Sequence, residues 1–162
     1  MSDLPYLAGY APALLERVRD LRDGGKLRAW VEQRHPDRHA VQTDKALYQY
    51  VDALRQRHMR NAPLLSRVQF DSQQHPMRGT LGTHTFVSRT QGGKLKAKHE
   101  IRIAALFRDA PAAFLQMIVV HELAHMKEKD HNKAFYQLCC HMEPDYHQLE
   151  FDMRVWLTVR EG

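Results

Sequence analysis

The residues best suited to chemistry in this sequence form a His-Glu-x-x-His pattern at His121, Glu122 and His125, followed by another histidine at His131. Residues four apart share one face of a helix, so His121 and His125 can direct both imidazoles at one point, as two ligands of a zinc ion must. Glu122 is rotated around that helix and can act as a general base towards a water molecule beside the metal. The pattern predicts a zinc hydrolase site.

The third ligand is open to several candidates, because a catalytic zinc ion usually takes three protein ligands and keeps one position free. His131 follows the predicted end of the motif helix, where a turn can return it to His125. The metzincin pattern makes the same six-residue step through a glycine. Glu128 stands at that position here, so we expect the bend across Lys129 and Asp130. His131 is the preferred ligand, and the rival candidates are Glu143, Glu150, His141 and His147.

Three helices are predicted around the motif. The apolar stretch 114–120 leads into it and indicates a buried helix, whose start is marked by Asp109 and Pro111. Asn132 is the expected cap of the next helix, and Pro144 opens a final one. The motif therefore lies on the first of three consecutive helices.

The chain before the motif helix is predicted to hold helices and then a sheet. Apolar residues recur at helical spacing through residues 1–63, and Thr43 can cap the longest helix there. Residues 64–107 alternate in the manner of strands, with a hairpin turn at 91–94. A basic row alternates along the last strand, as a solvated face or as a contact for phosphate or nucleic acid. This row consists of Lys94, Lys96 and Lys98.

Together these elements predict one α+β domain spanning residues 1–162. Its helical N-terminal part covers 1–63, and a small antiparallel sheet covers 64–107. The active-site helix and two C-terminal helices occupy 108–162. One domain of this length is enough to bury a substantial core around the motif.

The composition favours a soluble protein of the cytoplasm. Hydrophobic residues make up 43% of the chain and charged residues 27%, an ordinary globular balance. No apolar run is long enough for a membrane span, and the N-terminus lacks the apolar core of a signal peptide. Cys139 and Cys140 are adjacent and cannot build a disulfide framework, in agreement with a reducing compartment.

Three stretches of the sequence resemble the signature of the YgjP-like metallopeptidase family, a relative of the SprT-like and WLM zinc proteases. These stretches are 119–125, 131–135 and 144–146. The resemblance extends to the N-terminal helices. It implies a zincin-like minimal metalloprotease core that holds one zinc ion per chain on His121, His125 and His131, with Glu122 as the base. The family also includes proteins labelled UTP pyrophosphatase.

We expect the protein to be a zinc-dependent hydrolase, and first of all a metallopeptidase. Zinc activates a water molecule, and Glu122 accepts the water proton and passes it to the leaving group. Tyr146 or His147, at the start of the last helix, is a candidate for stabilising the oxyanion, although packing is the simpler role for Tyr146. A peptide substrate would lie along an edge strand of the sheet.

Two other functions remain open. A UTP pyrophosphatase would use the basic row to contact phosphates, but the sequence has neither a P-loop nor an acidic cluster for magnesium. A DNA-associated binding module is favoured by 24 Lys and Arg against 19 Asp and Glu, and by a pI near 9.4. No recognition motif accompanies that modest charge of +5. The expected partner is thus a peptide, a protein or a nucleotide, and the oligomeric state is left open.

Overall fold

The computed structural model describes residues 3–74, 82–91 and 94–161, and it describes the side chains of these residues except for 83–91 and 94–98. The helical elements before the sheet are η1 (Pro5–Leu7), α1 (Pro12–Asp23), α2 (Leu27–Arg34) and α3 (Asp44–His58). The strands are β1 (Leu65–Asp71), β2 (Gly82–Gln91) and β3 (Lys94–Ala104). The helical elements after the sheet are η3 (Ala105–Asp109), α4 (Ala112–Ala124), α5 (Lys133–Met142) and α6 (Tyr146–Glu161). This order confirms the predicted α+β class.

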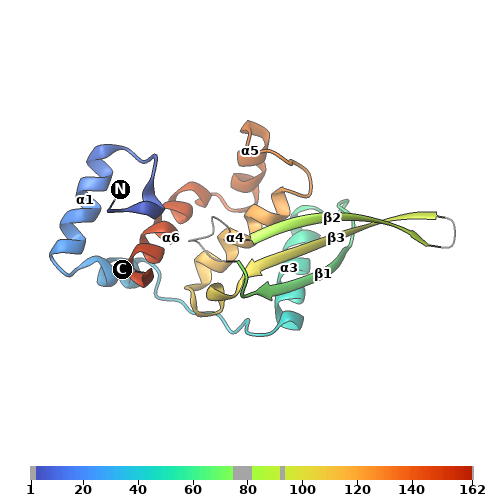
Figure 1. Ribbon diagram of the computed structural model, residues 1–162, viewed down its shortest axis with the longest axis horizontal. Coiled ribbons are helices and arrows are strands. Elements are labelled where there is room, and N and C mark those ends of the chain that lie inside the picture. Colours follow the sequence, from blue (N-terminus) through green and yellow to red (C-terminus); the bar gives the residue numbers. More distant parts are fainter. Residues whose placement is uncertain (1–2, 75–81, 92–93, 162) are drawn as a thin grey trace.

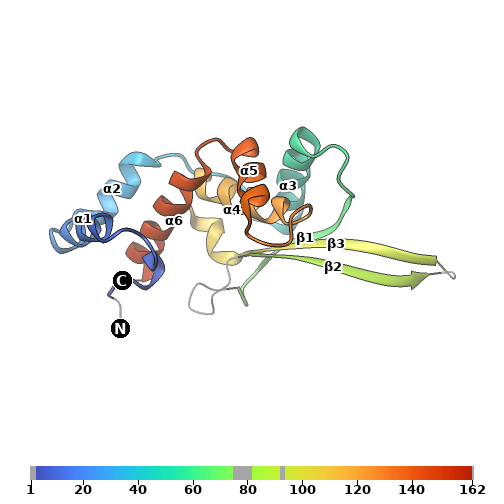
Figure 2. The same ribbon diagram turned by 90° about the horizontal axis from the view of Figure 1, so that it is seen from above.

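The helices and the sheet form two layers. Figure 2 shows α3, α4 and α5 on one side of the strands, while α1 and α2 lie beyond α6 at one end of the molecule. β2 and β3 extend past the helices as a long hairpin (Figure 1). Among the described helices, none combines the length and the apolar character that crossing a membrane requires.

The sheet has the order β1-β3-β2 and is mixed. β2 pairs antiparallel with β3, from Gly82 opposite Ile103 to Gln91 opposite Lys94, which confirms the predicted hairpin. β1 instead runs parallel to β3, so the prediction of a wholly antiparallel sheet was wrong. β3 lies between the two strands that precede it in the sequence. β1 and β2 therefore run in opposite directions without being neighbours.

Side-chain caps fix the start of two helices. The Oγ1 atom of Thr43 accepts a hydrogen bond from the backbone N–H of Ala46 at the start of α3, at 3.1 Å. The Oδ1 atom of Asn132 accepts from the backbone N–H of Phe135 at the start of α5, at 2.9 Å. Both caps were predicted from the sequence, because a short polar side chain at this position satisfies an otherwise unpaired helix amide.

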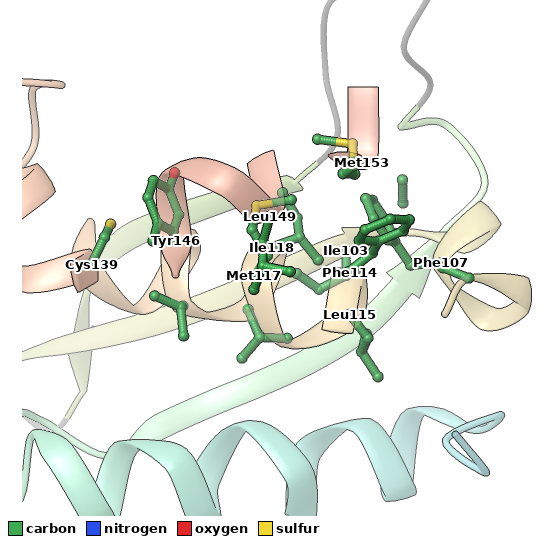
Figure 3. Packing of buried hydrophobic residues seen from close by; sticks show 14 of the residues in the cluster. Ile103, Phe107, Phe114, Leu115, Met117, Ile118, Cys139, Tyr146, Leu149 and Met153 are labelled. Atoms are coloured by element: carbon green, nitrogen blue, oxygen red, sulfur yellow. The ribbon is translucent and has the colours of Figure 1, made fainter. Parts of the chain in front are cut away.

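The core is built around α4, in which nine of thirteen residues are buried. A helix that is apolar on all sides needs neighbours on all sides. The sheet and α3 cover one part of its surface, and α5 and α6 cover the rest. Figure 3 shows Phe114 and Ile118 of α4 packed among Ile103 of β3, Phe107 of η3 and Met153 of α6. This packing holds the end of α4, and with it the motif, in a fixed position.

α6 also holds the N-terminal helices. Asp152 is fully buried on α6, and one of its oxygens accepts from Arg34 at 3.1 Å and lies 2.7 Å from Nε2 of His35. Further along α6, the guanidinium of Arg154 donates to the backbone carbonyl of Tyr6 at 3.2 Å. The described residues up to His35 are thus attached to α6.

Candidate metal centre

Three histidine side chains converge at the end of α4 and in the loop after it. The Nε2 atoms of His121 and His125 lie 3.3 Å apart, those of His125 and His131 lie 3.0 Å apart, and those of His121 and His131 lie 3.3 Å apart. Across the part of the chain that the structure describes, these residues are the one group of His, Cys, Asp and Glu side chains placed to hold a metal ion. His131 is exposed, so the group is open to solvent on its side.

The spacing of these nitrogens fits a zinc ion. Tetrahedral zinc binds histidine nitrogens at about 2.0–2.1 Å, which places two such nitrogens roughly 3.3 Å apart. Hydrogen bonds do not account for the same spacing, because a neutral imidazole has a single N–H. Nδ1 of His125 lies 3.0 Å from the backbone carbonyl oxygen of Glu128, and a carbonyl only accepts. Nδ1 therefore carries the proton, and the lone pair of Nε2 faces the other histidines.

The turn after α4 brings His131 back without a glycine. The backbone N–H of Glu128 donates to the carbonyl of Ala124 at 2.9 Å, and that of Asn132 donates to Asp130 at 2.9 Å. Among the described residues, no residue other than glycine has a positive φ. The chain thus makes the bend with ordinary backbone conformations, where the metzincin pattern uses a glycine.

Phe135 forms the floor beneath the three histidines. Its ring centroid lies 5.0 Å from that of His121, 4.5 Å from that of His125 and 5.0 Å from that of His131. The side chain is fully buried, and its backbone N–H is held by the Asn132 cap. One aromatic ring therefore packs against all three imidazoles and limits their motion.

The imidazoles of His121 and His125 favour their neutral forms. Burial, followed by the charges of His125 and His131, lowers the pKa of His121 to about 3. Burial also lowers the pKa of His125 below its ordinary value. At neutral pH these rings are unprotonated, which is the form that binds a metal ion.

Tyr146 lies behind His121. Its hydroxyl oxygen is 2.7 Å from Nδ1 of His121, and its ring is fully buried between α5 and α6, close to Cys139 (Figure 3). Burial, together with the charge of Glu150, raises the pKa of Tyr146 above its ordinary value. The hydroxyl thus contacts the nitrogen of His121 that does not face the other two histidines.

Glu122 lies on another side of α4, between the helix and the first residue of β2. Its side chain is buried with 2% exposure. A Cβ atom added to Gly82 would lie 2.7 Å from Oε2 of Glu122, so only glycine allows the backbone of β2 to pack on this carboxylate. Burial raises the pKa of Glu122 to about 8. Such a shift in a carboxyl group next to a candidate metal ligand is typical of a functional site.

The two acidic rivals for the third ligand have other contacts. Glu143 precedes α6, and its Oε2 atom accepts from the backbone N–H of Asp145 at 3.0 Å. Glu150 lies one turn along α6 from Tyr146, and its Oε1 atom pairs with Arg154 at 3.7 Å. The structure therefore places both carboxylates away from the three-histidine group.

The two histidine rivals also lie outside the group. His141 is exposed on α5, with its ring 6.0 Å from that of His58. His147 is exposed in the first turn of α6, 5.3 Å from the ring of Tyr136 and 5.5 Å from that of Tyr146. As a candidate for stabilising the oxyanion, His147 has the accessibility that the buried Tyr146 lacks.

The basic row lies in β3, but its side chains are outside the described part of the structure. The interpretation of Lys94, Lys96 and Lys98 as phosphate or nucleic-acid contacts therefore stays a prediction. The backbone of β3 places these residues in the half of the hairpin that extends beyond the helices (Figure 1).

Several contacts of the site were missed from the sequence. The floor formed by Phe135 and the carbonyl of Glu128 depend on the path of the loop after α4. The contact of Gly82 with Glu122 joins segments forty positions apart. A glycine at the start of a strand was the available signal, since such residues often mark a close approach of the backbone.

Comparisons with known proteins bear on the same region. A family model described as the YgjP-like metallopeptidase domain matches residues 85–155, which include the three histidines, Glu122 and Tyr146. A curated protein of Escherichia coli (strain K12) named UTP pyrophosphatase is 59% identical over 158 residues, which cover 98% of this chain and 95% of that protein. No solved structure matches the chain.

Proposed function

The chain belongs to the YgjP-like family, and from this membership and the geometry of its histidines we propose that it is a zinc-dependent hydrolase. The observation that carries the proposal is the triangle of Nε2 atoms with sides of 3.0–3.3 Å. His121, His125 and His131 would hold the ion. When bound, zinc supplies a Lewis acid that lowers the pKa of water and polarises the bond to be cleaved.

Glu122 is the proposed general base. It accepts a proton from the attacking water and returns it to the leaving group. Because burial raises its pKa to about 8, it needs a positive charge nearby to be ionised at neutral pH. The site would thus have an effective base when its histidines hold a cation. Gly82 supports this role by leaving space for the carboxylate beside β2.

For the substrate, we propose UTP first. The relative named UTP pyrophosphatase matches nearly the whole chain at 59% identity, whereas the family description applies to residues 85–155. This reverses the order expected from the sequence. In the proposed reaction one water molecule cleaves the bond between the α and β phosphates of UTP, which gives UMP and pyrophosphate. The basic row lies in the part of β3 that extends beyond the helices, so it would attract the charged nucleotide towards the protein rather than hold it at the site.

A peptide bond is the second candidate substrate. The description of the family as a metallopeptidase domain favours it, and so does the position of β2 at the edge of the sheet beside Glu122. An extended peptide can add to such an edge through main-chain hydrogen bonds. The same three histidines and the same base would serve this reaction.

The test compares the wild-type protein with Glu122→Gln and with Glu32→Gln, an exposed carboxylate on α2 that serves as the control. Zinc content, pyrophosphate release from UTP and cleavage of casein are measured in the same preparations. We expect wild type and the control to contain about one zinc per chain and to release pyrophosphate. Glu122→Gln should keep its zinc and lose activity by about 10²–10⁴-fold. Wild-type protein without zinc, or full activity of Glu122→Gln, would contradict the proposal. Cleavage of casein without cleavage of UTP would make the peptide bond the first candidate substrate in place of UTP.

A further inference from the structure

The hydroxyl group of Tyr146 occupies a position that can control His121. Its oxygen lies 2.7 Å from Nδ1 of His121, while Nε2 of the same ring faces the other two histidines. The two rings lie nearly parallel, 6.4 Å apart with an interplanar angle of 20°. The tyrosine ring is fully buried, so this contact has a fixed geometry.

A tyrosine hydroxyl can accept a hydrogen bond, and a neutral imidazole has a single N–H. When Nδ1 of His121 carries that N–H, it donates to the oxygen of Tyr146. The lone pair of Nε2 then faces the Nε2 atoms of His125 and His131, each 3.3 Å away.

We propose that Tyr146 is a positioning residue that holds His121 in the tautomer with a free lone pair on Nε2. This inference rests on the proposed function, because that lone pair is the one that would bind zinc. His125 achieves the same tautomer through the backbone carbonyl of Glu128, which a substitution at position 128 would not remove. The partner of His121 is the side chain of Tyr146, so a substitution can remove it.

Loss of the hydroxyl should weaken zinc binding without unfolding the protein. Tyr146→Phe keeps the ring and removes only the oxygen, after which the proton of His121 can occupy Nε2 and compete with the metal. Partners of this kind are typically worth about 10–100-fold in metal affinity.

The experiment measures zinc affinity by competition with a chromophoric chelator. Tyr48→Phe is the matched control, because it also deletes a tyrosine hydroxyl; that of Tyr48, which is half-buried, donates to the carbonyl of Leu65 at 3.2 Å. We expect the zinc dissociation constant to rise about 10–100-fold in Tyr146→Phe and to stay unchanged in Tyr48→Phe. Thermal melting of the metal-free proteins reports whether either variant has lost structure.

A second readout follows the tautomer directly. Long-range ¹H–¹⁵N spectra of the metal-free protein should show His121 protonated at Nδ1 in wild type, and a share of the Nε2-protonated form in Tyr146→Phe. Zinc affinity of Tyr146→Phe equal to wild type, or an unchanged tautomer, overturns the inference while leaving the hydrolase proposal intact. Wild-type protein that binds no zinc overturns both. If Tyr146→Phe does not fold, the wild-type spectrum decides the matter, because a metal-free His121 protonated at Nε2 overturns the inference.

Discussion

Replacing Glu122 with glutamine should stabilise the metal-free protein at neutral pH. The folded state raises the pKa of this carboxyl group from 4.5 to about 8 through burial, so the folded protein keeps a proton that the unfolded chain releases. Between these two values the stability lost by the wild type grows with pH, by about 1.4 kcal/mol per unit. The loss is therefore below about 1 kcal/mol at pH 5 and about 3 kcal/mol at pH 7. Glutamine does not ionise, so the variant does not lose this part of its stability.

The assay is urea unfolding of zinc-free wild type, Glu122→Gln and the exposed control Glu32→Gln at pH 5 and pH 7. Taking the difference from wild type at each pH removes the contribution of the other titrating groups, such as His121. We expect the free energy of unfolding of Glu122→Gln, relative to that of wild type, to be about 2–3 kcal/mol higher at pH 7 than at pH 5. This corresponds to roughly 5–10 °C in melting temperature. Glu32→Gln should gain nothing.

Bound zinc should reduce this difference, because a nearby cation favours the ionised carboxylate. Equal differences from wild type at both pH values would mean that the folded protein does not hold a proton on Glu122. The account of how burial affects this side chain would then be wrong. A pH-dependent gain that persists unchanged with zinc bound would instead place the carboxylate out of reach of the metal's field.

Three further outcomes are expected. His125→Ala should lose bound zinc, whereas His141→Ala should retain it, as measured by metal analysis after gel filtration. Gly82→Ala should lower turnover about 10–100-fold at unchanged zinc content, because the new Cβ atom displaces the carboxylate of the candidate base. Burial raises the pKa of Cys139 to about 12, so at pH 8 a thiol reagent should label Cys140 first and Cys139 only after unfolding, as mass spectrometry can show.

The local features of the fold could be predicted from the sequence. The caps at Thr43 and Asn132 depend on a few neighbouring residues, and the structure contains both. The convergence of His121 and His125 follows from helical geometry alone. His131 could be added because only six residues and the end of a helix separate it from His125, which leaves few paths for the chain.

The contacts that were missed join distant parts of the chain. β1 pairs with β3 because β3 inserts between β1 and β2. The alternation of side chains along a strand does not show which strands will be neighbours in the sheet. The roles of Tyr146 and Gly82 depend on where α6 and β2 lie against α4. From the sequence, Tyr146 in an apolar helical stripe could serve packing alone as readily as a role at the site. Only the tertiary structure shows that its hydroxyl contacts His121.

The attachment of residues 3–35 to α6 also affects the order in which the chain can fold during synthesis. Arg154 hydrogen-bonds a residue 148 positions earlier, and Asp152 hydrogen-bonds one 118 positions earlier. These N-terminal helices leave the ribosome before α6, yet the surface on which they dock belongs to α6. Such long-range closure slows folding. Tyr146 begins that same helix, so the histidines should reach their final arrangement, and take up metal tightly, only after α6 has emerged.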